Sequence, residues 1–195
     1  MNRAFALIGV AVLCQNAFVF ASTPPPQPTL LTHVKPLPKA LNSDFEFRKT
    51  KLFLMTETPP ETKKSSKNPA ANRDFTSSKA PSAVQAAAIT FERQYRLYGA
   101  VTKFDQHQRF GNYLDFFWRT KRPADLTVRL EYRQEKTHAH VQAQQISYNN
   151  VRGNHKTEFK VVGDDYFDGG RVIAWRCLLI ENDKIVAEDR SFLWD

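Results

Sequence analysis

The clearest pattern of apolar and polar positions lies at the C-terminal end, in residues 171–194. In its first arm alternate residues are apolar on both faces: one face carries Ile173, Trp175, Cys177 and Leu179, and the other carries Val172, Ala174, Leu178 and Ile180. Only Arg176 is charged, so the pattern predicts a strand inside a sheet rather than at its edge. Asn182-Asp183 then fits a two-residue type I′ turn. A second arm holding Ile185, Ala187, Phe192 and Trp194 completes a predicted β-hairpin.

The preceding eighty residues alternate in the manner of further strands. We predict one bent strand or two short ones over 89–101, and strands over 113–119, 126–133 and 157–162, with a bulged edge strand over 139–148. Pro123 is expected to break the chain between two strands, and residues 163–170 are expected to form a loop. About seven antiparallel strands in residues 88–195 predict an all-β, two-sheet sandwich.

The N-terminal residues have a different composition. Residues 1–21 combine Arg3, an apolar run and a small residue at Ala21, which predicts a secretory signal peptide cleaved after Ala21. Retention as an N-terminal membrane anchor is an alternative. Lipidation at Cys14 is another, although the preceding Leu13 is larger than the small residue usual there. Cleavage would leave Cys177 as the one cysteine, which we expect to be a buried hydrophobe rather than a reactive thiol.

Residues 22–87 are rich in Pro, Lys, Ser and Thr and are predicted to form a long disordered linker. One apolar island, residues 44–55, interrupts them. It is either a stray apolar patch, an extra strand on the edge of the domain, or a docking segment that adds a strand to the sheet of a partner protein.

The formal charge of +8 is concentrated in the linker. Lys and Arg outnumber Asp and Glu by 10 to 5 in residues 22–86, but only by 17 to 15 in residues 87–195. The predicted domain is therefore nearly neutral, and a nucleic-acid partner is not expected.

Two features of the predicted domain resemble a known family of β-sandwiches. They are Trp118 on the third predicted strand and Trp175-Arg176-Cys177 on the sixth. Over residues 88–195 the domain resembles immunoglobulin-like and fibronectin type III-like β-sandwich domains, although Trp175 stands at the usual Tyr position and no second cysteine is available for the inter-sheet disulfide. The segments YRLYGAVT, FFWRTKRPADLTVRLEYRQ and KTEFKVVGDDY also look like secreted bacterial proteins of unknown function. The resemblance implies an architecture and no particular activity.

Few residues in the sequence suggest a metal-binding or catalytic site. His138 and His140 are spaced as on one face of a strand, with His155 nearby in sequence, but no further ligand completes a zinc or copper site. The acidic residues Asp164, Asp165 and Asp168 lack the spacing of a helical calcium loop. We therefore predict no metal, no cofactor, no catalytic residues and no enzyme activity.

Aromatic residues give the remaining functional hint. On strand 113–119, Phe116 and Trp118 share one face and Tyr113 and Phe117 share the other, so one pair can face outward. The outward residues, together with the charged residues of the next strand, give a predicted binding surface of Tyr113, Phe117, Arg129, Glu131 and Arg133. We expect an exported periplasmic or secreted module that binds a protein partner of the cell envelope through a sheet face or an edge strand; a carbohydrate-binding accessory domain is the alternative.

Overall fold

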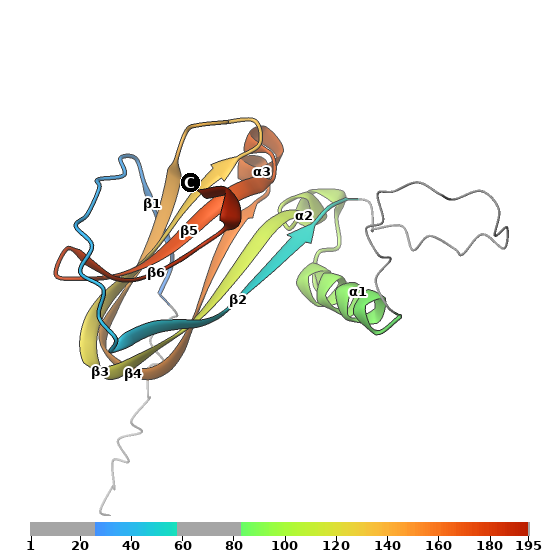
Figure 1. The fold of residues 1–195 in the computed structure, drawn as a ribbon. Helices are drawn as coiled ribbons and strands as arrows, with labels where there is room; N and C mark the ends of the chain where they lie inside the picture. The colour runs from blue at the N-terminus through green and yellow to red at the C-terminus, as the bar shows by residue number, and fades with distance from the viewer. Residues whose placement is uncertain (1–25, 58–82, 195) are drawn as a thin grey trace, which may run out of the picture.

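The computed structural model of the chain describes residues 26–57 and 83–194, and the described chain is mostly antiparallel β-sheet (Figure 1). This agrees with the all-β prediction at the level of fold class. The elements in chain order are β1 Thr29–Leu31, β2 Phe45–Met55, α1 Ala83–Leu97, α2 Lys103–His107, β3 Gly111–Gln134, β4 Gln142–Val162, α3 Asp164–Gly169, β5 Val172–Glu181, β6 Lys184–Arg190 and the short 3₁₀ helix η1 Phe192–Trp194. The predicted signal peptide, residues 1–21, lies outside the described residues.

The predicted C-terminal hairpin is confirmed as β5 and β6. Asn182 and Asp183 both have positive φ, 49° and 57°, as a type I′ turn requires. The sheet order β1-β4-β3-β5-β6 places β5 between two strands. Its two apolar faces are both covered, because Cys177 lies in the main core while Leu178 belongs to a second cluster on the opposite face, against which Leu37 packs.

The core forms where one very long hairpin, β3 with β4, folds over itself (Figure 1). The first half of β3 pairs with β2 and the second half pairs with β5, while β4 follows both halves. The break predicted at Pro123 is corrected: the strand continues through it. The β3–β4 register shifts between Thr120 and Leu126, and such an interruption of the ladder accommodates a proline, which has no N–H to donate.

Residues from both halves of this hairpin meet in the main core. Phe116 and Trp118 from the first half and Leu130 and Tyr132 from the second are completely buried in one cluster. The predicted division of the aromatic strand is confirmed, since Tyr113 belongs instead to a separate cluster with Met55 and Phe110. The described residues contain six strands, four of them within 88–195, so the predicted seven strands and two-sheet sandwich are not confirmed.

The strand predicted over residues 89–101 is wrong, because Ala83–Leu97 is the helix α1. Its start, AVQAAA, has high helix propensity, and Phe91, Tyr95 and Tyr98 follow one another at spacings of four and three residues. The β-branched and aromatic residues between Ile89 and Tyr98 favour strands when they are considered alone, which explains the error.

Three smaller predictions also need correction. The predicted loop 163–170 contains the helix α3, the predicted strand 139–148 begins only at Gln142, and Phe192 and Trp194 lie in η1 rather than in a strand. Furthermore, β1, β2 and the first residues of α1 lie in the segment 22–87 that was predicted as linker. No helix in residues 26–57 and 83–194 has both the length and the apolar character needed to cross a bilayer.

Candidate functional site

The five residues of the predicted binding surface lie on the outer face of β3 but in two separate places. Tyr113 and Phe117 belong to its first half, beside β2 and α1. Tyr113 is buried and donates its hydroxyl to the Arg109 carbonyl oxygen over 2.7 Å, whereas Phe117 is half-buried. Burial raises the pKa of the Tyr113 phenol.

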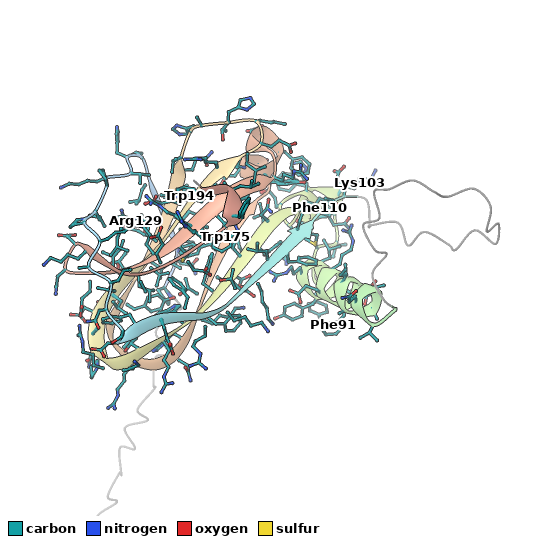
Figure 2. All side chains as sticks on the ribbon, viewed as in Figure 1. Phe91, Lys103, Phe110, Arg129, Trp175 and Trp194 are labelled. Carbon is teal, nitrogen blue, oxygen red and sulfur yellow. The ribbon has the colours of Figure 1, made fainter. Side chains whose placement is uncertain are left out.

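The second half of β3 carries Arg129, Glu131 and Arg133, where the C-terminal end of the chain covers it. The Trp194 ring of η1 lies under the guanidinium groups of Arg133 and Arg176, whose carbons are 4.8 and 5.1 Å from its centroid. Glu131 is only 2% exposed and accepts from Arg176 over 2.7 Å. The Arg133 and Arg176 guanidinium groups therefore hold η1, whose Trp194 is labelled in Figure 2, on the sheet.

The apolar island, residues 44–55, supplies the strand β2, which pairs with β3 of the same domain. This is the predicted alternative of an extra strand on the edge of the domain. Within the described ranges β2 pairs with β3 alone, so its other edge forms no strand ladder, although the first half of this edge lies beside β6. An unpaired strand edge carries a row of main-chain donors and acceptors that a further strand can use.

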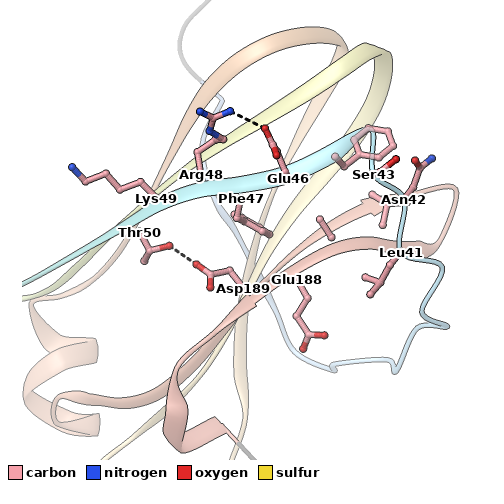
Figure 3. Close-up of a pocket in the computed structure, with 13 residues that line it drawn as sticks. Leu41, Asn42, Ser43, Glu46, Phe47, Arg48, Lys49, Thr50, Glu188 and Asp189 are labelled. Atoms are coloured by element: carbon pink, nitrogen blue, oxygen red, sulfur yellow. Dashed lines mark hydrogen bonds and ion pairs between the residues drawn. The ribbon is translucent and has the colours of Figure 1, made fainter.

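A groove runs along the first half of this edge, between β2 and β6 (Figure 3). We call it the β2–β6 groove; it has a volume of about 620 Å³, and its lining residues are Leu41–Ser43, Phe45–Thr50 and Val186–Asp189. Phe47 points between the two strands and packs edge-on against Phe116, with ring centroids 6.2 Å apart. The floor of the groove is therefore apolar and its rim is polar.

The main chain of Phe47 faces this groove. Phe45 donates its N–H to the Asn42 carbonyl oxygen over 3.1 Å, on the side away from β3. Because N–H and C=O groups of successive residues in a strand point alternately to opposite sides, those of Phe47 also turn away from β3. A β-bulge follows at once, since the register with β3 shifts between Phe47 and Lys49.

Polar contacts close the two ends of the groove. The Thr50 hydroxyl donates to the Asp189 carboxylate, which ties β2 to β6 at one end. At the other end Ala40 and Asn42 donate their N–H groups to Ile185 and Val186 of β6 over 2.8 and 3.0 Å. Beyond Thr50 the edge of β2 continues, and it carries two exposed leucines, Leu52 and Leu54, at 56% and 41% exposure.

Charges on the rim of the groove are paired locally. Glu46 accepts from Arg48 over 2.9 Å, and this hydrogen bond lowers the pKa of the Glu46 carboxyl group. Glu188 forms an ion pair with Lys39 at 2.6 Å. The rim is thus nearly balanced in charge and favours neither a strongly acidic nor a strongly basic ligand.

A second cleft, of about 530 Å³, lies between α1 and the outer face of β2, β3 and β4. Its centre is Arg96, whose guanidinium carbon lies 3.8 Å from the centroid of the Tyr113 ring and which forms ion pairs with Glu92 and Glu158. These two carboxylates raise the pKa of Arg96 despite its partial burial, which opposes the rise. The contacts that Arg96 makes across this cleft thus hold α1 on the sheet.

The histidines considered for a metal site lie apart. His138 is in the turn before β4, whereas His155 is on β4 opposite Trp118 and stacks on its indole ring at 4.7 Å. Among the residues that the structure describes, no three His, Cys, Asp or Glu side chains are grouped to hold a metal ion.

Sequence reasoning did not identify the β2–β6 groove. Its two walls are more than 130 residues apart in the chain, and only the apolar island at 44–55 signalled that this segment had a role. Comparison with known protein families, with curated proteins and with solved structures gives no match for this chain.

Proposed function

We propose that this chain is an exported, non-catalytic binding module of the cell envelope that recognises a protein partner by strand addition. An extended segment of the partner pairs with the free edge of β2 and places one apolar side chain in the β2–β6 groove. Export rests on the predicted signal peptide, and the immunoglobulin-like assignment rests on the sequence resemblance alone.

The observation that supports this proposal is the unpaired edge of β2, which is open beyond the Thr50–Asp189 contact, at residues 51–55. Five residues of extended chain span about 17 Å, which is long enough for a short partner strand. Most proteins protect such an edge by shortening it or covering it. The strand at the opposite edge of the sheet, β1, has only three residues.

Side chains on the same strand agree with this use. Leu52 and Leu54 are exposed next to the unpaired edge, and an added strand would cover them with its own alternate side chains. The Thr50–Asp189 contact separates this part of the edge from the groove, so that main-chain pairing and side-chain insertion occupy different positions. Main-chain hydrogen bonds would then supply affinity and the groove would supply specificity.

A carbohydrate partner is the less favoured alternative. Flat sugar rings bind to exposed aromatic rings, whereas Phe117 is half-buried and has the Lys51 and Lys156 ammonium groups 5.5 and 5.9 Å from its ring centroid. Tyr113, its neighbour on the same face, is buried under Arg96.

Selection of peptide ligands tests the proposal. A library of displayed random peptides is selected against the purified full-length chain, and affinities of the selected peptides are measured by titration calorimetry. The double substitution Leu52→Glu, Leu54→Glu puts two carboxylates beside the edge of β2, and we expect it to weaken binding at least about tenfold, or about 1.4 kcal/mol. Both side chains are exposed, so the thermal midpoint should change little.

The matched control is Leu30→Glu, which changes an exposed leucine on the opposite edge strand, β1. It should leave peptide affinity unchanged. Selected peptides that bind the edge variant as well as the original chain would contradict strand addition to β2. Turnover of any peptide or glycan by the purified chain would contradict the non-catalytic part of the proposal.

A further inference from the structure

The helix α1 and the turn just after it carry a row of apolar side chains that are largely exposed, although Tyr95 lines the cleft between α1 and the sheet. We call it the aromatic stripe; its members are Val84, Ala88, Phe91, Tyr95 and Tyr98, and they follow one another at alternating spacings of four and three residues. Such a spacing places all of them on one side of a helix. Phe91, Tyr95 and Tyr98 are 69%, 70% and 86% exposed, and the stripe ends beside the equally exposed Val101 and Phe104.

The opposite side of α1 is fixed to the sheet, so the stripe cannot turn inward. Arg93 donates to the main-chain oxygens of Thr56 and Glu57, just after β2, and lies over the Phe110 ring. Arg96 is held by Tyr113 and Glu158, and Leu97 packs against the small cluster of Met55, Phe110 and Tyr113. The helix therefore binds its own domain largely with arginines and presents its rings to solvent, at the end of the molecule where β2 ends (Figure 1).

This arrangement is the reverse of an ordinary surface helix, which buries its apolar side and exposes its charges. An exposed apolar row of this length is characteristic of an interaction surface. Its alternating spacing of four and three residues is that of the seam between two packed helices. The occupant that the row fits is thus another helix with a similar row.

We propose that the aromatic stripe is the interface of a homodimer, in which α1 of one copy packs antiparallel against α1 of a second copy. Tyr95 of the stripe and Leu52 of β2 line the same cleft, so the two surfaces are neighbours. The pairing of the helices nevertheless does not depend on the proposed partner recognition at the β2 edge. The two ends of the stripe differ in size, with Ala88 and Val84 at one end and Tyr98 at the other. Antiparallel pairing sets the small end of each helix against the large end of its mate.

The residues that flank the stripe permit this self-pairing. Gln85, Ala87 and Gln94 are uncharged, and Glu92 is directed to Arg96 of the same helix at 2.6 Å. The two Glu92 carboxylates come near each other across the midpoint of an antiparallel pair, and the Arg96 partner of each one offsets their repulsion. A membrane surface fits less well, because an interfacial helix carries Lys and Arg beside its apolar face, and both arginines of α1 are used on the sheet side.

The exposed area falls in the lower part of the range that specific dimers bury. The four rings of Phe91, Tyr95, Tyr98 and Phe104 are 69–86% exposed. At about 150–250 Å² for each ring, they offer about 450–750 Å² per copy, before Val84 and Val101 are added. A standard interface buries about 800 Å² per partner.

Sedimentation velocity of the purified full-length chain over a range of concentrations tests the dimer. We expect a monomer of 22.4 kDa that shifts to twice this mass as concentration rises. The double substitution Phe91→Glu, Tyr95→Glu should raise the dissociation constant more than tenfold, because it brings four carboxylates into the seam. Phe192→Glu, a change of an even more exposed ring on η1, should leave the dimer unchanged.

A cross-link tests the orientation. In a chain carrying Cys14→Ser, where Cys177 is buried, antiparallel pairing sets Ala88 of one copy opposite Tyr95 of the other. It therefore predicts a disulfide dimer from a mixture of the Ala88→Cys and Tyr95→Cys chains and none from Ala88→Cys alone. Efficient self-linking of Ala88→Cys would overturn the antiparallel arrangement.

Two results would overturn the dimer itself. One is a monomer at every concentration, or a dimer that the stripe variant does not weaken. The other is binding to vesicles of anionic phospholipid that the stripe variant abolishes while the chain stays monomeric, which would assign the stripe to a membrane surface. Neither result concerns the edge of β2, so the proposed partner recognition is judged separately by the peptide experiment.

Discussion

The rest of the chain covers the two ends of the long β3–β4 hairpin to very different extents. At the end that carries β5 and β6, both faces of the sheet are covered: Leu37 packs on Leu178, and Trp194 of η1 lies over Arg133 and Arg176. At the end that carries β2 and α1, one strand edge is unpaired and the aromatic stripe of α1 is exposed. Both ends are rich in apolar residues, so composition alone does not distinguish them.

The difference indicates which apolar residues stabilise the domain and which are available to other molecules. Burial removes apolar area from water at about 25 cal/mol per Å², so the covered end contributes to the free energy of folding. The uncovered end contributes little to that free energy until a partner covers it. Substitutions at the covered end should therefore change stability, and those at the β2 and α1 end should change association.

The largest effect is expected in the shared core. Trp118 is completely buried and donates its indole N–H to the Thr157 hydroxyl over 2.9 Å. Trp118→Ala leaves a large cavity and should lower the free energy of unfolding by about 3–5 kcal/mol, measured by urea denaturation. A loss below about 1 kcal/mol would mean that the two halves of the hairpin do not share this core.

The next effect concerns the charges under η1. Glu131→Ala removes the buried partner of Arg176 and should cost about 2–3 kcal/mol, less than the upper range for buried pairs because Arg176 also lies 3.9 Å from Glu188. Trp194 fluorescence should shift to longer wavelength if η1 loosens as well. An unchanged denaturation midpoint would indicate that this pair does not stabilise the covered end.

Alkaline pH should weaken the covered end by a smaller amount. Burial raises the pKa of the Cys177 thiol well above its ordinary 9.0, and it also raises the pKa of Tyr132. The folded state therefore favours the protonated forms, so their contribution is complete below the ordinary pKa values and is lost as pH rises above them. We expect the free energy of unfolding to fall above about pH 9, by up to about 1.4 kcal/mol per pH unit for each group. Between pH 6 and 8, Cys177 should make no pH-dependent contribution to it. Rapid alkylation of native Cys177 at pH 8 would contradict its burial.

The smallest effects on stability are expected at the uncovered end. Leu52→Ala and Phe91→Ala each change the free energy of unfolding by about 0.5 kcal/mol or less, because both side chains are more than half exposed. Urea denaturation at low protein concentration, where dimers dissociate, makes this measurement. A loss of 2 kcal/mol or more at either position would mean that the side chain packs within its own domain.

Patterns within single strands predicted the C-terminal hairpin and the main core well. The hairpin of β5 and β6, the burial of Cys177 and the inward face of Phe116 and Trp118 all follow from alternation over ten residues or fewer. The continuity of β3 through Pro123 could not be predicted in this way, because it depends on a register shift against β4.

The uncovered end was predicted poorly because its arrangement depends on contacts between distant segments. The helix α1 was interpreted as a strand, since its inward arginines and outward rings reverse the usual pattern of a surface helix. The covered end holds a similar error, because Glu131 was expected on the outer surface and nothing close to it in sequence indicates that η1 covers this part of the sheet. The β2–β6 groove depends on two strands from opposite ends of the chain.

Hydrogen–deuterium exchange with and without a selected peptide tests the central claim most directly, namely that the free edge of β2 is the binding site. We predict new protection of the backbone amides in residues 45–55, with little change at η1 or along α1. Protection that appears only in α1, or at the face covered by Trp194, with residues 45–55 exchanging as before, would contradict strand addition at this edge.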